Sequence, residues 1–309
     1  MSARPAILVT AADLAPQAVA LLMDFEMVYA GKAPTEAEVT ALCAKVQPVA
    51  IIVRYGKVTA AMMDASKPLH VISKHGVGID TIDQKAAKER GIEVRAAAGA
   101  NADAVAEHSW ALILACAKGV DTLDARMRAG HWDKSTHKSL ELRGKTLGVV
   151  GLGAIGRRVA TIGAAFGMKV VAFDPFAKAS PEGVARVSLA ELFSVSEVVS
   201  LNCPLTDDNR HMVNAATLAT MRDGVIIVNT GRGGLIDEAA LIDALASGKV
   251  RSAGLDSFSV EPFVGEHHFR AIPNVVLTPH VGGVSEDAYV NMGTAAAQNI
   301  LDVLKKVAA

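Results

Sequence analysis

The stretch "VVGLGAIGRRVA" (149–160) decides which fold we expect for this chain. Gly151, Gly153 and Gly156 have the G-x-G-x-x-G spacing, with a strand-like run before them and a helix-like run after them. The first glycine permits a tight turn, the second lets the backbone approach a diphosphate, and the third lets helix and strand pack closely. This context predicts a dinucleotide-binding turn rather than a glycine-rich loop that binds nothing.

The residues around this turn indicate which dinucleotide would bind. The N–H groups of Ala154 and Ile155 open the helix, where the helix dipole favours a diphosphate. Asp174 ends the next strand-like run, where it would accept hydrogen bonds from the adenosine ribose and repel the 2′-phosphate of NADP. No arginine follows in "DPFAKASP" (174–181), so we predict NAD as the cofactor.

Short apolar runs that alternate with amphipathic helical patterns extend this prediction to the whole chain. Near-continuous apolar strands joined by helical crossovers indicate parallel sheets buried on both faces. We therefore predict an α/β protein with two Rossmann-like, doubly wound parallel-sheet domains, one of them discontinuous in sequence. The domains are expected at 1–100 plus 284–309 and at 101–283, with helices over 101–120 and 285–307 and a capping box at Thr35 and Glu38. The expected strands lie at 6–10, 50–55, 70–74, 92–96, 146–152, 169–174, 198–202, 225–230, 253–258 and 274–279.

Composition argues against several kinds of partner. The chain has 309 residues and a formal net charge of −1, so it has no basic field to attract nucleic acid or a membrane surface. Cys43, Cys116 and Cys203 are far apart and lack metal-ligand spacing, which argues against disulfides and a metal site. Asp13 and Pro16 interrupt any signal-peptide core, and no apolar run reaches the roughly 18 residues of a membrane span. We expect a cytoplasmic protein.

Three polar side chains follow successive strand-like runs of the second domain. Arg232 stands among glycines in "NTGRGGLIDE", Glu261 follows "AGLDSF", and His280 follows "NVVLTP". Alone, each is more often a solvated loop residue or a structural histidine. Because the carboxyl ends of parallel strands meet at one edge of a sheet, we expect the three to share a site there.

The chain resembles the D-isomer-specific 2-hydroxyacid dehydrogenase family over essentially its whole length. Within this family it is most similar to the D-3-phosphoglycerate dehydrogenase and hydroxypyruvate reductase branch. The resemblance rests on "KHGVGIDTID", "GANADAVAEH", "LRGKTLGVVGLGAIGRRVA", "NTGRGGLIDE", "DSFSVEPF" and "TPHVGG". It implies that Arg232 holds the substrate carboxylate and that His280 exchanges a proton with the substrate oxygen. Glu261 beside the imidazole would raise the pKa of His280.

The resemblance also implies further contacts. It makes 101–283 the NAD-binding domain and the other segments the substrate domain, in which the backbone of Val77 and Gly78 would hold the substrate carboxylate. Arg54 would reach a substrate phosphate or sulfonate, or is an ordinary strand-end arginine beside Tyr55. Asp256 would bind the nicotinamide carboxamide, or caps a turn. The remaining residues expected around the nicotinamide are Cys203 (or an inert buried thiol), Pro204, Thr230, Gly231, Gly282 and Gly283.

The expected activity is hydride transfer between NAD and C2 of a small D-2-hydroxy acid or 2-oxo acid. Hydroxypyruvate, phosphohydroxypyruvate, glyoxylate and sulfopyruvate stay open as substrates. The alternatives are a phosphite- or formate-type dehydrogenase and an NAD(H)-binding sensor of the corepressor kind. The resemblance implies a homodimer formed through the cofactor domain and, without the longer relatives' regulatory domain, no feedback control of that kind. Packing at the domain junction or a dimer contact is expected for His108, Trp110, His131 and Trp132.

Overall fold

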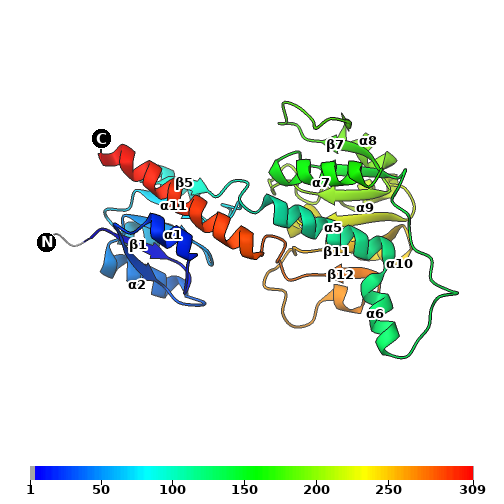
Figure 1. Ribbon diagram of the computed structural model, residues 1–309, viewed down its shortest axis with the longest axis horizontal. Coiled ribbons are helices and arrows are strands. Elements are labelled where there is room, and N and C mark those ends of the chain that lie inside the picture. Colours follow the sequence, from blue (N-terminus) through cyan, green and yellow to red (C-terminus); the bar gives the residue numbers. More distant parts are fainter. Residues whose placement is uncertain (1–3, 309) are drawn as a thin grey trace. The chain divides into compact units, whose positions relative to one another are not determined.

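The computed structural model describes residues 4–308 and divides into two compact units. The first unit comprises the residues up to Asn101 together with those from Val284 onward, and the second is Ala102–Gly283. Each unit is built on its own parallel sheet, which confirms the predicted fold class (Figure 1).

The first unit contains a five-stranded parallel sheet with the strand order β2-β1-β3-β4-β5. Side chains alternate across it: Ile7 and Val9 lie in a core shared with α1 and α11, whereas Leu8 lies in a core on the other face. The predicted capping box is present, with Thr35 N–H donating to Glu38 Oε2 at 2.7 Å. The elements are β1 (Ala6–Val9), α1 (Pro16–Leu21), β2 (Glu26–Tyr29), α2 (Glu36–Val46), β3 (Ala50–Val53), α3 (Ala60–Ala65), β4 (Val71–Lys74), α4 (Gln84–Glu89), β5 (Glu93–Ala96) and α11 (Glu286–Ala308).

The second unit contains a seven-stranded parallel sheet with the order β12-β11-β10-β9-β6-β7-β8. The six predicted strands of this unit are present, and β8 is a seventh that the sequence analysis missed. The strands are β6 (Thr146–Val150), β7 (Lys169–Phe173), β8 (Val184–Arg186), β9 (Val198–Leu201), β10 (Val225–Asn229), β11 (Val250–Leu255) and β12 (Val275–Leu277). The helices are α5 (Ala102–Lys118), α6 (Val120–Arg128), α7 (Ala154–Ala165), α8 (Leu189–Val195), α9 (Ala215–Thr220) and α10 (Glu238–Ala246), with 3-10 turns at Gly233–Leu235 and His268–Ala271.

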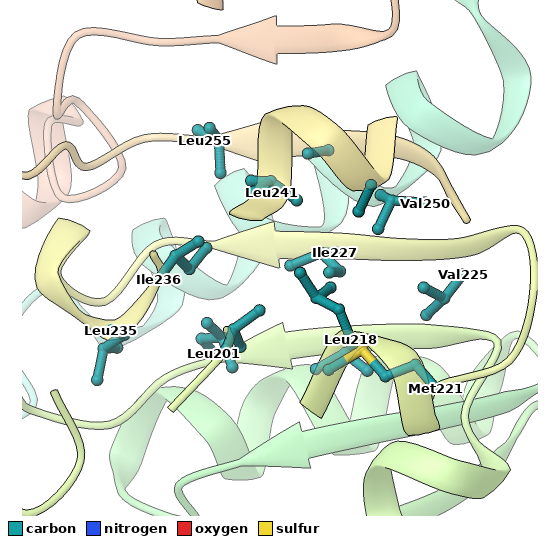
Figure 2. Packing of buried hydrophobic residues seen from close by; sticks show 14 of the residues in the cluster. Leu201, Leu218, Met221, Val225, Ile227, Leu235, Ile236, Leu241, Val250 and Leu255 are labelled. Atoms are coloured by element: carbon teal, nitrogen blue, oxygen red, sulfur yellow. The ribbon is translucent and has the colours of Figure 1, made fainter. Parts of the chain in front are cut away.

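Both faces of this second sheet are covered by apolar side chains. On one face Ile227 of β10 packs in a cluster with Leu218 and Met221 at α9 and Leu241 of α10 (Figure 2). On the other face Ile226 packs in a cluster with side chains from α5 and α7. Full burial of a side chain of this size contributes about 1.5–3 kcal/mol to folding. The doubly covered sheet is thus a rigid support for the loops at its edge.

Trp110 belongs to this packing, which corrects the expectation of a junction or dimer contact. Its ring is buried within the second unit and stacks on Phe166 with centroids 4.7 Å apart. Its Nε1–H donates to Val159 O at 3.1 Å. The side chain therefore fixes α5 against α7. Among residues 4–308, no helix has the length and apolar character needed to cross a bilayer.

The strand order of the second sheet reverses between β6 and β9. From β6 the chain builds outward through β7 and β8, and from β9 it builds outward in the opposite direction through β10, β11 and β12. The loops at the carboxyl ends of two such strands turn to opposite faces of the sheet, which opens a crevice where α/β proteins bind ligands. The residues that follow β6 and β9 are therefore the candidates for ligand binding.

Candidate functional site

The glycine-rich turn occupies the carboxyl end of β6. Gly151 has φ +94°, and a Cβ there would lie 2.9 Å from Asn202 O. A Cβ at Gly156 would lie only 1.8 Å from Gly151 O, so this position of α7 requires glycine. At Gly153, which caps α7, a Cβ would meet no protein atom within 4 Å. The turn thus presents an approachable backbone at a helix N-terminus, which fits the diphosphate of a dinucleotide.

Asp174 follows β7 and is tied to this turn by hydrogen bonds. Its Oδ2 accepts from Leu152 N–H at 2.7 Å, and its Oδ1 accepts from the N–H groups of Phe176 and Ala177. Arg186 of β8 donates to the backbone oxygen of Asp174 at 3.1 Å. The carboxylate is therefore fixed beside the glycine-rich turn. Arg186 could not be anticipated from the segment 174–181, because it lies beyond this segment on the neighbouring strand β8.

Three strand ends converge on Cys203, which follows β9. A Cβ on Gly151 would lie 3.0 Å from Cys203 N, and one on Gly231 would lie 3.0 Å from Cys203 O. Burial raises the pKa of the Cys203 thiol to about 11, so the thiol is neutral at physiological pH. Thr230 is held by Ser109 of α5, with 2.8 Å between the hydroxyl oxygens. Pro204, by contrast, is exposed.

Arg232 lies in a turn that the buried Asn229 shapes. The Asn229 amide donates to Arg232 O at 2.9 Å, and its Oδ1 accepts from Gly231 N–H at 3.0 Å. The next residue must be glycine, because a Cβ at Gly233 would lie 1.9 Å from the backbone of Phe258. The half-buried guanidinium donates to Gly231 O at 2.9 Å. The turn thus holds a cation at the carboxyl end of β10.

His280 and Glu261 form a hydrogen-bonded pair in the same unit. His280 Nδ1 lies 2.7 Å from Glu261 Oε2, and Phe258 N–H donates to Glu261 Oε1 at 2.9 Å. His280 has φ +55°, a left-handed conformation that is unusual for a residue with a side chain. The backbone therefore adopts an unfavourable geometry where it presents this imidazole.

Neighbouring charges act in opposite directions on this pair. The hydrogen bond and charge of Glu261 raise the pKa of His280 above its ordinary value, whereas partial burial and the charge of Arg232 lower it. Burial alone would raise the pKa of Glu261, but the hydrogen bonds from His280 and Phe258, with the charges of His280 and Arg232, bring it below its ordinary value. The arrangement can hold a proton on an imidazole beside a fixed cation.

Asp256 supports the segment that carries His280. It is 2% exposed and accepts from Thr278 Oγ1 at 2.6 Å, Val281 N–H at 2.9 Å and Gly282 N–H at 2.8 Å. A Cβ at Gly282 would lie 2.9 Å from Asp256 Oδ2, which explains the glycine. These contacts are those of a turn cap, the alternative that the sequence left open. The bond to the nicotinamide carboxamide stays a prediction, as does the role of Gly283.

His108 joins this network, while its expected place at the domain junction or a dimer contact stays a prediction. His108 Nε2 lies 2.9 Å from Thr278 Oγ1 and 3.4 Å from Asp256 Oδ1. The sequence carried no local signal for this contact, because 170 residues separate the two partners of the shorter bond. Only the packing of α5 on the sheet brings them together.

The predicted substrate residues lie at the carboxyl edge of the first unit's sheet. Arg54 follows β3, and Val77 and Gly78 belong to the loop after β4, the neighbouring strand. Val77 is exposed. The guanidinium of Arg54 is paired with the carboxylate of Asp13, a partner that the sequence analysis did not identify.

Comparison with known proteins agrees with these features. Residues 110–282 match the family described as "D-isomer specific 2-hydroxyacid dehydrogenase, NAD binding domain". A hydroxypyruvate reductase of Thermotoga maritima is 44% identical over 250 residues, which cover 80% of this chain and 82% of that protein. A D-3-phosphoglycerate dehydrogenase of Archaeoglobus fulgidus is 40% identical over 260 residues, covering 83% of this chain and 49% of the relative, so this chain spans about half of that longer protein.

A solved structure extends the similarity to nearly the whole chain. The crystal structure of a glyoxylate reductase from Paecilomyes thermophila superposes with a TM-score of 0.88 at 33% identity, covering 99% of this chain and 97% of that one. The matched segment 110–282 contains the glycine-rich turn, Arg232, Glu261 and His280. This chain therefore belongs to the D-isomer-specific 2-hydroxyacid dehydrogenase family and is an NAD-dependent oxidoreductase.

Proposed function

We propose that this chain reduces a short 2-oxo acid of the hydroxypyruvate or glyoxylate type to the D-2-hydroxy acid with NADH, and catalyses the reverse oxidation. The observation that carries the proposal is the His280–Glu261 pair at 2.7 Å, in the same unit as Arg232. The relatives named hydroxypyruvate reductase, D-3-phosphoglycerate dehydrogenase and glyoxylate reductase support this substrate class.

Each of the three residues has a distinct role in the proposed reaction. When bound, NADH supplies a hydride to C2 of the substrate. Arg232 binds the substrate carboxylate and polarises the carbonyl. His280 donates a proton to the oxygen that becomes the hydroxyl, while Glu261 holds the imidazole in position and favours its charged form. In the oxidation, neutral His280 removes the same proton. Val77 and Gly78 remain proposed ligands of the carboxylate.

The cofactor site is proposed at the crevice between β6 and β9. Gly151, Gly153 and Gly156, with the N–H groups of Ala154 and Ile155, would hold the diphosphate. Asp174 would bind the ribose hydroxyls and exclude NADPH. The expected result is a much lower kcat/KM with NADPH than with NADH at matched concentrations. Equal or better use of NADPH would contradict the role of Asp174. Arg186, which contacts the Asp174 backbone, would then be the alternative residue that sets the choice of cofactor.

The same proposal places the nicotinamide at the neighbouring strand ends. The chain atoms proposed to line it are those of Cys203, Pro204, Thr230, Gly231, Asp256, Gly282 and Gly283.

The decisive experiment is His280→Gln. Because general acid catalysis contributes roughly a hundredfold or more, kcat should fall by at least that factor while NADH affinity, measured by fluorescence titration, stays nearly unchanged. His268→Gln, at an exposed histidine of the same unit, serves as the matched control and should retain full turnover. Near-normal turnover of His280→Gln would remove the histidine from the mechanism.

We also propose a cytoplasmic homodimer that forms through the cofactor unit. Helix α6 has no buried residue, and Val120 and Met127 on it and Trp132 after it are exposed, the last 73%. Figure 1 shows α6 extending away from the sheet of the second unit. Exposed apolar side chains this close together in the sequence favour α6 and the residues after it as the interaction surface. All three cysteines are free, which suits a reducing compartment.

Sedimentation tests the dimer. Trp132→Glu should shift the chain toward monomer, whereas Met23→Glu, at an exposed methionine of the first unit, should not. A wild-type monomer at micromolar concentration would contradict the proposal.

A further inference from the structure

Polar side chains gather at the carboxyl edge of the first unit's sheet. Asp13 follows β1 and Arg54 follows β3, two strands that are adjacent in the sheet. Tyr289 of α11 donates its hydroxyl to Asp13 Oδ1 at 2.7 Å. This edge is where a parallel α/β sheet binds ligands, and the predicted substrate residues Val77 and Gly78 lie at it. Asp13, Arg54 and Tyr289 therefore lie where a sheet of this kind binds ligands.

The guanidinium of Arg54 is held by three neighbours. Its Nη1 donates to Asp13 Oδ1 in an ion pair and to Asp13 O at 2.9 Å. Its Cζ lies 4.8 Å from the ring centre of Tyr289 and 5.3 Å from that of Tyr55. The Arg54 side chain is 13% exposed, whereas that of Asp13 is 66% exposed. A substrate that approaches this edge from solvent therefore meets the carboxylate more readily than the guanidinium.

The charges of the neighbouring groups are defined at neutral pH. Hydrogen bonds from Tyr289 and Arg54 lower the pKa of Asp13, so it is ionised. Burial lowers the pKa of His75 to about 4 and raises that of Tyr289 to about 12, so both are neutral. Lys74 lies beside the pair and donates to Arg54 O at 3.2 Å. Asp13 is thus the anion that compensates Arg54.

On the basis of the function proposed above, we propose that Asp13 determines substrate specificity, selecting a 2-oxo acid with a neutral hydroxyl at C3 over one with a phosphate or sulfonate. A phosphate is recognised best by an arginine fork that can form two parallel hydrogen bonds, and Arg54 already uses its Nη1 on Asp13. The Asp13 carboxylate also repels a second anion. Tyr289 and Arg54 both bond to Oδ1, so Oδ2 can accept from a substrate hydroxyl.

The test compares three substrates in wild type and Asp13→Asn. We would measure kcat/KM with NADH for hydroxypyruvate, 3-phosphohydroxypyruvate and sulfopyruvate. Wild type should prefer hydroxypyruvate. Asparagine keeps an oxygen for Tyr289 and removes the charge, so the ratio should move toward the two anionic substrates by roughly tenfold, a modest factor because solvent screens the exposed Asp13.

Two controls separate charge compensation from general disturbance. Adding Arg54→Gln to the Asp13→Asn background should abolish the gain, because the guanidinium whose charge is no longer compensated is its source. Asp64→Asn breaks another aspartate–arginine pair on the same unit, in which Arg90 Nε donates to Asp64 Oδ1 at 2.8 Å. That variant should leave the substrate ratio unchanged.

The possible failures are distinguishable. No turnover of any 2-oxo acid would overturn the proposed function. Calorimetric binding of D-glycerate and 3-phosphoglycerate would then still test Asp13, because only the Asp13→Asn variant should gain affinity for the phosphorylated acid. Turnover with an unchanged ratio in Asp13→Asn, or a wild-type preference for phosphohydroxypyruvate, would overturn the role of Asp13 alone.

Discussion

Replacing Glu261 by glutamine removes a negative charge that lies 2.7 Å from the imidazole of His280, with little change in side-chain size. The amide oxygen can still accept a hydrogen bond from Nδ1, and the bond from Phe258 N–H to Oε1 is then lost. The substitution therefore tests the charge of Glu261 more than the orientation of the ring. The reduction requires protonated His280, so its rate falls as the pH rises through the pKa of this residue.

The magnitude follows from the geometry. An opposite charge within about 4–6 Å shifts a pKa by roughly 1–3 units. The His280 and Glu261 side chains are 45% and 34% exposed, so solvent screens the pair and favours the lower end of this range. Glu261 raises the pKa of His280 in the wild type. In Glu261→Gln the loss of reductive activity should thus begin at lower pH than in the wild type.

The assay is kcat/KM for NADH-dependent reduction between about pH 5.5 and 9.5. In the oxidative direction, which needs neutral His280, the rising limb should move to lower pH by the same amount. Glu266→Gln, at an exposed glutamate five residues along, should leave both profiles in place. A Glu261→Gln profile that coincides with that of wild type, at unchanged NADH affinity, would refute the reasoning.

Three further substitutions test the two sheets. Gly156→Ala places a Cβ 1.8 Å from Gly151 O, so calorimetry should show a loss of roughly 1–3 kcal/mol or more together with weakened NADH binding. Gly153→Ala meets no protein atom within 4 Å and should leave Tm within about one degree while lowering NADH affinity; unchanged affinity would contradict a diphosphate site there. His75→Leu tests whether protonation of His75 is linked to the free energy of unfolding. The folded pKa of His75 is about 4, whereas the unfolded histidine titrates near 6.5, so the unfolded state binds the extra proton and stability falls as pH drops below about 6.5. The variant should therefore lose about 2 kcal/mol less than wild type between pH 7 and 5 in denaturant titrations, and an identical pH dependence would contradict the burial of a neutral imidazole.

The central strands, all of which the sequence predicted, carry apolar side chains on both faces. In β10, "VIIVN", every residue is buried, and such a run is visible without any structure. The strands that the sequence analysis missed lie at sheet edges: all four residues of β2 are exposed or half-buried, and β8 has three residues of which one is buried. Edge strands have one neighbour and need little apolar surface, so their apolar pattern is harder to recognise, although the edge strands β5 and β12 were predicted.

The sequence allows two kinds of site residue to be anticipated: those close together along the chain, and those that directly follow parallel strands. The parallel sheet explains why Arg232, Glu261 and His280 were expected together. Contacts that depend on packing between distant segments could not be anticipated. The bond between His108 and Thr278 spans 170 residues, and that between Arg54 and Asp13 spans 41. No periodicity or spacing encodes such a pair, and each one changes what a neighbouring group can do.

The opposed charges around His280 lead to a last expectation for catalysis. Arg232 lowers the pKa of His280, whereas Glu261 raises it. A substrate carboxylate bound to Arg232 offsets the positive charge, so substrate binding itself should favour the protonated imidazole that reduction needs. In the reduction, the pH profile of kcat reports the substrate complex and that of kcat/KM reports the free enzyme. The fall in kcat should then occur at higher pH than the fall in kcat/KM. In Arg232→Lys, where the carboxylate is held less rigidly, the separation should shrink. Coincident limbs in wild type would show that Arg232 does not transmit substrate binding to His280.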